Sequence, residues 1–149
     1  MSKISQIFDG FESLVSTTFP SHKKLVNPYD LEQGNDSLAL NRGVGFYLGP
    51  ANNTNRQIGC FLSIQRDVVF VLSIANRGTD RDVSIRQSAE KQILEDLITL
   101  IKATEEDPNL NELASKVLYQ SDEGLQLFVN QYNYLVIQAR FQIEYIEEI

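Results

Sequence analysis

Residues 58–75 carry the clearest alternation of hydrophobic and polar positions in the chain. Every second residue from Cys60 to Ile74 is apolar except Arg66, and the intervening positions are mixed. This period of two, with its enrichment in valine and isoleucine, is typical of a β-strand that buries one face. Arg66 and Asp67 in the middle could mark a bulge or a junction between two strands. The pattern favours one long strand.

The period changes to that of a helix over residues 83–103. Ile85, Ala89, Ile93, Leu97 and Ile101 recur every four residues, and charged side chains take the opposite side. This is the pattern of an amphipathic α-helix. A strand and a helix that each bury one face most simply bury them against each other. We therefore expect this strand and this helix to form the core.

Shorter patterns predict the remaining elements. Apolar residues with helical spacing predict a first helix over residues 3–17, capped by Ser2. Alternation of apolar and polar residues predicts a strand at residues 135–145 with one buried and one solvent-exposed face. We expect it to pair with a strand at residues 117–120. A further short strand is expected at residues 46–48.

The fold class predicted from these elements is α+β. A mixed, largely antiparallel sheet of about four strands is packed by two amphipathic helices, with a long loop in the N-terminal half. At 149 residues the chain is expected to be a single domain, residues 1–149.

The predicted loop, residues 19–57, is rich in proline, glycine and asparagine but too apolar for a disordered linker. Functional loops are one recognised reason for such a segment, and we expect it to pack on a neighbouring molecule. Tyr29 and Leu31 are its best anchors because they fit neither the helical stripes nor the main strands. Arginines that follow the long strand could meet a phosphate or a partner carboxylate, or could be counterions of nearby acids. The candidate interface residues are Tyr29, Leu31, Phe46, Tyr47, Arg66, Arg77 and Arg81.

Charge is unevenly distributed along the chain. The net charge is −7; residues 1–103 hold 11 basic and 11 acidic side chains, whereas residues 104–149 hold two basic and nine acidic ones. An acidic C-terminal third argues against a nucleic-acid-binding surface there, since phosphate affinity comes from lysine and arginine. The alternative is an ordinary solvated acidic face. No apolar run is long enough to span a bilayer and no signal peptide is evident, so we expect no membrane partner.

Candidate catalytic residues are few. His22 is the only histidine and is interpreted as a surface residue without a partner, and Cys60 is interpreted as a buried inert thiol. Acidic clusters at Asp80–Asp82 and Glu105–Asp107 could collect a hard cation, but turns and helix caps use the same residues. We expect no catalytic site, no cofactor and no metal, and the chain is predicted not to be an enzyme.

One resemblance rests on three segments. Residues 49–54 (GPANNT), residues 63–67 (SIQRD) in the long strand, and the acidic and basic pairs at 90–91 and 95–96 in the helix are found together. In these segments, and in the order of its elements, the chain resembles the tail terminator (tail-completion) and neck proteins of long-tailed bacteriophages. The order covers most of the chain, and the local motif covers about residues 49–102.

The resemblance implies a virion structural protein, assembled in the host cytoplasm and located in the tail or neck. It would form a homo-hexameric ring that stops tail-tube polymerisation and joins the tail to the neck. Its partners would be further copies of itself, the tail tube protein and a neck or head-completion protein, while DNA passes through the channel without specific binding. Such rings need heterologous interfaces, and the long loop and the outer face of the sheet are the candidates. Two alternatives remain: another neck component, such as a head-closure or adaptor subunit, or a small ligand-binding or enzymatic α+β domain.

Overall fold

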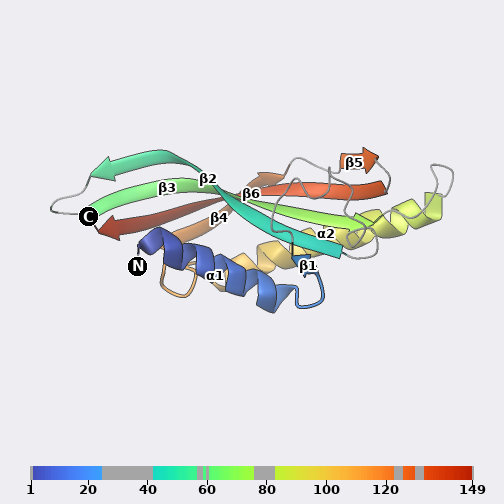
Figure 1. Ribbon diagram of the computed structural model, residues 1–149, viewed down its shortest axis with the longest axis horizontal. Coiled ribbons are helices and arrows are strands. Elements are labelled where there is room, and N and C mark those ends of the chain that lie inside the picture. Colours follow the sequence, from blue (N-terminus) through green and yellow to red (C-terminus); the bar gives the residue numbers. More distant parts are fainter. Residues whose placement is uncertain are drawn as a thin grey trace.

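The computed structural model describes residues 2–24, 42–56, 59, 61–75, 83–122, 126–129 and 133–148. Two helices lie along one side of a long, twisted sheet, which confirms the α+β class (Figure 1). The elements, in chain order, are α1 (Lys3–Thr18), β1 (Lys23–Lys24), β2 (Arg42–Arg56), β3 (Phe61–Ala75), α2 (Val83–Glu106), β4 (Lys116–Asp122), β5 (Gln126–Val129) and β6 (Asn133–Glu148).

The sheet is mixed and largely antiparallel, as predicted. Its strand order is β1-β2-β3-β6-β4, and β5 also pairs with β6. Among the described strands, only the short β1–β2 ladder is parallel. β3 pairs with β6 without a break from Phe61 to Ala75, so Arg66 and Asp67 lie within one continuous strand. β4 pairs with β6 as predicted, and the short strands β1 and β5 add to the four that the sequence indicated.

β2 corrects the sequence prediction of a mostly irregular segment over residues 19–57. The expected strand covered only residues 46–48, whereas β2 runs from Arg42 to Arg56 and pairs with β3 along its length. Proline and glycine hid the alternation, yet both are tolerated in edge strands and at bulges. Pro50 lies in the register shift between Leu48 and Ala51, beyond the part of β2 that pairs with β1.

The start of β3 also differs from the prediction. The strand begins at Phe61 rather than at residue 58. Gly59 has a φ of 91°, which is a left-handed conformation that favours glycine and that a regular strand does not adopt. The hydrophobic alternation in the sequence begins before the strand does, so the predicted strand was too long at its start.

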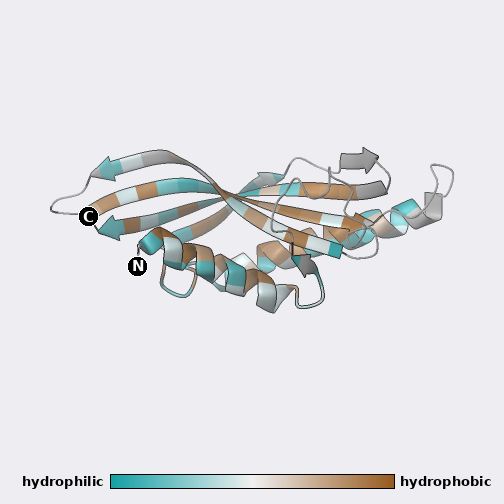
Figure 2. Cartoon of the chain, in the orientation of Figure 1, coloured by the Kyte–Doolittle hydropathy of each residue, from teal (hydrophilic) through white to brown (hydrophobic). Residues whose placement is uncertain are grey.

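The core lies between the helices and the facing side of the sheet. Hydrophobic residues recur along the strands and along both helices (Figure 2). A chain of aromatic contacts crosses it: Phe11 to Phe70 at 5.7 Å, Phe70 to Phe141 at 5.2 Å, and Phe141 to Tyr119 at 5.4 Å between ring centroids. The packing of β3 on α2 was correctly predicted. Among the described residues, the buried hydrophobic cluster is Ile7, Phe11, Val15, Phe19, Val44, Val68, Phe70, Leu72, Ile74, Ala89, Ile93, Leu97, Leu100, Leu110, Ala114, Val117, Leu135, Ile137, Ala139, Phe141, Ile143 and Tyr145.

The two ends of the chain lie close together (Figure 1), and hydrogen bonds join them at the start of α1. The backbone N–H of Lys3 donates to Glu147 Oε1 at 3.0 Å and that of Ile4 donates to Oε2 at 3.3 Å. Ser2 caps the helix as predicted, since its hydroxyl accepts from the N–H of Ser5. A carboxylate at a helix N-terminus is favoured by the helix dipole, so Glu147 fastens the end of β6 to α1. None of the helices in the described ranges is long and apolar enough to cross a membrane.

Candidate functional site

His22, Arg42 and Asp96 form a buried ionic cluster, which we call the Asp96 clamp. His22 Nε2 lies 3.0 Å from Asp96 Oδ2, and Arg42 Nε donates to the same oxygen at 3.1 Å. Arg42 Nη2 donates to the other carboxylate oxygen, Oδ1. The side chains of His22 and Asp96 are 9% and 8% exposed, whereas that of Arg42 is 38% exposed. Both oxygens of one buried carboxylate are therefore occupied by partners that lie far from it in the sequence.

The clamp corrects the interpretation of His22 as a surface residue without a partner. Its ring is buried against Phe19, with centroids 4.7 Å apart, and pairs with a carboxylate 74 positions away in the sequence. One signal could have revealed this. Asp96 follows Ile93 by three positions and precedes Leu100 by four, so it lies on the core face of α2, where a carboxylate needs a partner.

Asp96 holds the two flanks of residues 25–41 at one place. His22 precedes β1 and Arg42 begins β2, and the parallel pairing of Lys23 with Gly43 and of Lys24 with Val44 joins the same two flanks. Lys24 adds a tie to α1, since its Nζ donates to the carbonyl oxygens of Phe19 at 2.9 Å and Val15 at 3.3 Å. Burial lowers the pKa of Lys24 from its usual value. The two described flanks of residues 25–41 are thus held next to each other.

The predicted interface residues fall into three groups. Tyr29, Leu31, Arg77 and Arg81 lie outside the described residues, as does Cys60. Phe46 packs within the subunit, with its ring 5.0 Å from that of Phe8 and 5.8 Å from that of Phe70.

Arg66 is also engaged within the subunit. Its Nη1 donates to the carbonyl oxygen of Gly49 at 2.9 Å, and its Nε donates to the Tyr145 hydroxyl at 3.4 Å. Tyr47 is the predicted interface residue that the structure leaves at the surface, with 39% of it exposed.

Tyr47 belongs to a group of exposed apolar residues on the sheet face opposite the helices. The pairing registers put the side chains of Tyr47, Phe61, Leu118 and Ile146 on this outer face. Their exposed fractions are 39–42%. Polar residues lie between them, and Gln65 donates to Glu144 across β3 and β6 at 3.1 Å. Alternating apolar and polar side chains on a rigid sheet are a composition that suits a protein–protein contact.

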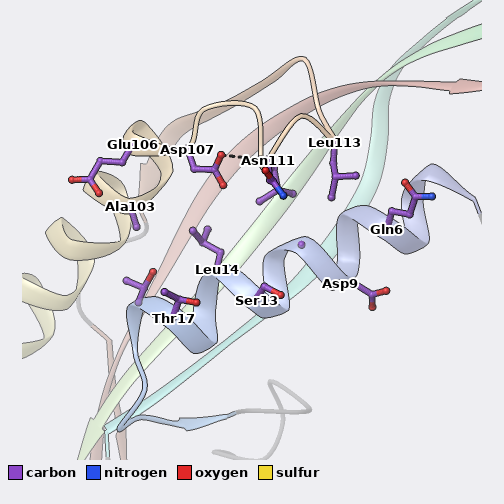
Figure 3. Close-up of a pocket in the computed structure, with 13 residues that line it drawn as sticks. Gln6, Asp9, Ser13, Leu14, Thr17, Ala103, Glu106, Asp107, Asn111 and Leu113 are labelled. Atoms are coloured by element: carbon purple, nitrogen blue, oxygen red, sulfur yellow. Dashed lines mark hydrogen bonds between the residues drawn. The ribbon is translucent and has the colours of Figure 1, made fainter.

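A groove lies on the helical side, between α1 and the turn that follows α2 (Figure 3). Its volume is about 640 Å³. The turn contains three successive residues in the left-handed region, with φ of 49° at Leu110, 55° at Asn111 and 66° at Glu112. Leucine and glutamate each pay about 1–2 kcal/mol there relative to the right-handed conformation, whereas asparagine adopts it more readily. Sequence patterns did not indicate this conformation, because leucine and glutamate rarely adopt it.

Hydrogen bonds hold the left-handed turn in place. Asp107 Oδ1 accepts from the N–H of Asn111 at 2.8 Å, and the carbonyl oxygen of Asn109 accepts from the N–H of Ala114 at 2.9 Å. The side chain of Leu110 is buried in the hydrophobic core and so fixes the turn to the rest of the subunit. These contacts offset the backbone strain and make the turn a fixed wall of the groove.

Comparison with protein-family models and with curated proteins gave no match to this chain. Within the described ranges there is also no group of three or more histidine, cysteine, aspartate or glutamate side chains arranged to hold a metal ion.

Proposed function

We propose that this protein is a virion structural protein that forms a ring at the head-proximal end of a phage tail. In this role it stops polymerisation of the tail tube and joins the tail to the neck. The proposal starts from the resemblance of residues 49–54, 63–67 and the α2 pairs at 90–91 and 95–96 to tail terminator and neck proteins. The partners would be further copies of the chain, the tail tube protein and a neck protein.

The outer face of the sheet is the observation that most supports this proposal. A subunit of a ring needs two different patches, because each copy meets one neighbour on each side. Tyr47 and Leu118 lie on strands at opposite sides of the β3–β6 pair, exposed on a framework that is rigid without any partner. This face suits one of the two patches.

The second patch is expected in residues 25–41, which include Tyr29 and Leu31. An assembly loop contributes more binding energy when its ends are already fixed, because less conformational entropy is lost on binding. The Asp96 clamp fixes both flanks of this segment.

The charge distribution is compatible with a ring that surrounds DNA. Basic residues are nearly absent from residues 104–149, so those residues offer few contacts to phosphates. A head-closure or adaptor subunit of the neck is the second candidate, since the same surfaces and charge would serve it equally well. The two differ in partner, because only a terminator binds the end of the tail tube.

Native mass spectrometry and negative-stain imaging, with and without tail tubes, test the proposal. We expect a closed ring of several copies that attaches to one end of the tubes. The double variant Tyr47→Ala with Leu118→Ala should weaken subunit contacts by about 2 kcal/mol, or roughly 30-fold in Kd, with an unchanged circular dichroism spectrum. Ser63→Ala, a polar position on the same face, is the matched control.

Two results separate the candidates. A protein that stays monomeric when concentrated and when mixed with tail tubes is not a tail or neck ring subunit. A ring that forms normally but does not bind tubes would favour the head-closure or adaptor role. Normal assembly of the Tyr47→Ala, Leu118→Ala variant would show that the outer face is not an interface. The double variant Tyr29→Ala with Leu31→Ala tests the second patch in the same way.

A further inference from the structure

We propose that two copies of this chain pair through the exposed side of α2, with the two helices antiparallel. The contact surface, which we call the α2 stripe, is formed by Lys91, Leu94, Glu95, Ile98 and Lys102, all exposed. The occupant of the stripe is the same stripe of a second copy. Such a contact is two-fold symmetric, whereas ring contacts are heterologous, so this inference does not depend on the ring proposal.

Two large aliphatic side chains form the centre of the α2 stripe. Leu94 is 45% exposed and Ile98 is 51% exposed, although Ile93 and Leu97 of the same helix are buried in the core. Leu94 and Ile98 are four positions apart, so they are neighbours on the helix surface. An apolar pair with this spacing can insert between the side chains of a facing helix, as in a coiled coil.

The charges of the α2 stripe are complementary to those of the same stripe in the reverse direction. When two copies of α2 run antiparallel and cross between residues 98 and 99, Glu95 of each copy lies opposite Lys102 of the other, because both are equally far from the crossing point. Lys91 lies opposite Glu106 for the same reason. Glu95 and Lys102 are seven positions apart, so they lie on the same side of the helix and meet on the same side of the contact.

The reverse direction is favoured over the parallel one. A parallel pair in register lacks these contacts and brings Glu90 of one copy toward Glu95 of the other, where like charges repel. Among the residues that the structure describes, Glu90 is paired with Arg86, whereas Lys91, Glu95 and Lys102 take part in no salt bridge. The charges that the antiparallel contact uses are therefore available to a second copy.

The expected affinity is low. One pair of crossing helices is at the small end of protein–protein interfaces, where complexes are transient. Exposed ion pairs contribute little each and are screened by salt. We therefore expect a dimer with a Kd of about 0.1–1 mM that weakens as the salt concentration rises.

Charge reversals test the proposed pairing. Glu95→Lys places lysines opposite each other in a pair of identical chains, and Lys102→Glu places glutamates opposite each other. Each variant should self-associate about tenfold more weakly than the unaltered chain in sedimentation equilibrium. An equimolar mixture of the two variants should pair again, because lysines of one chain then lie opposite glutamates of the other.

Zero-length cross-linking with a carbodiimide locates the contact. The reagent joins a carboxylate to a lysine amine only where the two touch, and Glu95 and Lys102 are about 10.5 Å apart along one helix. A cross-linked peptide that joins these two residues therefore comes from two chains, and mixed isotope-labelled and unlabelled protein verifies its origin. A ring built through other surfaces does not produce this link, so the two proposals can fail separately.

Matched variants separate the helix contact from a general effect of charge. Glu12→Lys changes the net charge by the same amount as Glu95→Lys, at an exposed position of α1, and should leave self-association unchanged. Ile98→Ala removes the apolar centre and should weaken association. Because Ile98 is half exposed, this variant should keep the circular dichroism spectrum of the unaltered chain.

Four outcomes would overturn the inference. They are absence of self-association up to about 1 mM, equal effects of Glu95→Lys and Glu12→Lys, a mixture of the two reversal variants that does not pair, and self-association without the link between Glu95 and Lys102. The last outcome would place the contact between copies on another surface.

Discussion

Replacing Asp96 by alanine removes the carboxylate that both His22 and Arg42 contact. Loss of one partner from a buried ion pair generally costs about 3–5 kcal/mol, because the remaining charge stays buried without compensation. The Arg42 side chain is 38% exposed, so water replaces part of what the guanidinium loses. We therefore expect the lower end of that range, a loss of about 3 kcal/mol. This is a large share of the 5–15 kcal/mol that stabilises a typical domain.

The size of the loss should depend on what replaces the carboxylate. Asp96→Asn keeps an oxygen acceptor of similar shape but loses the charge, so a smaller cost of about 1–2 kcal/mol is expected. His22→Ala should cost about 1 kcal/mol through the lost contact with Asp96. Glu95→Ala is the matched control. Glu95 is the exposed neighbour of Asp96 on α2, and its replacement should change stability by less than about 0.5 kcal/mol.

Urea unfolding followed by circular dichroism measures these differences, with the denaturant dependence checked for each variant. A double-mutant cycle between Arg42→Met and Asp96→Asn isolates the direct contact, and a coupling of about 1 kcal/mol or more is expected for residues that touch. The reasoning fails if Asp96→Ala is as stable as Glu95→Ala, or if the cycle gives no coupling. Either result would mean that the Asp96 carboxylate makes no net contribution to the free energy of unfolding.

Three further predictions concern the core, the left-handed turn and one tyrosine. Phe141→Ala should lower the free energy of unfolding by about 3–5 kcal/mol and Gln142→Ala by less than about 1 kcal/mol, since only Phe141 is fully buried; similar urea midpoints would show that the assigned faces of β6 are wrong. Glu112→Gly should raise stability by about 0.5–1 kcal/mol because glycine tolerates a φ of 66°; a variant less stable than Glu112→Ala in the same urea assay would contradict the strain argument. The hydrogen bond to Asp122, then burial, then the charge of Asp122 raise the pKa of Tyr119 from 10.0 to about 12. The stability linked to this raised pKa is present below about pH 10 and is lost as the pH rises toward 12, and ultraviolet titration against Tyr119→Phe should show the late ionisation disappear in that variant.

Periodicity along the sequence was sufficient to place the two helices and two of the long strands. α1, α2, β3 and β6 each repeat apolar residues with one period over ten or more positions, and their positions agree with the structure to within a few residues. β2 was recognised only in part, because a strand at a sheet edge with a register shift needs no strict alternation and tolerates Pro50. Its partner in the sheet, rather than its own sequence, determines that it is extended.

The candidate site was harder to predict than the fold, for two physical reasons. The Asp96 clamp joins residues 74 and 54 positions apart, and no local pattern encodes such a contact. The groove depends on a left-handed turn that tertiary contacts impose on residues with no preference for it. In contrast, the outer sheet face was foreseeable in part: Phe61 and Ile146 are exposed on it, whereas Val71 and Val136 on the same face are buried.

The clamp links the predicted assembly segment to the stability of the subunit. Asp96 lies on α2, and other buried residues of this helix, such as Ile93 and Leu97, belong to the hydrophobic core. A change at the clamp therefore also changes the stability of the core. A partner that binds residues 25–41 in one conformation would therefore stabilise the subunit, and a weakened clamp would raise the entropy lost on assembly. Under the ring proposal, Asp96→Asn should thus weaken assembly more than its effect on folding alone explains. Comparison with Phe141→Ala at a temperature where both variants are fully folded separates the two effects, because Phe141 has no contact with the clamp. Equal assembly of the two variants would show that the clamp serves stability only.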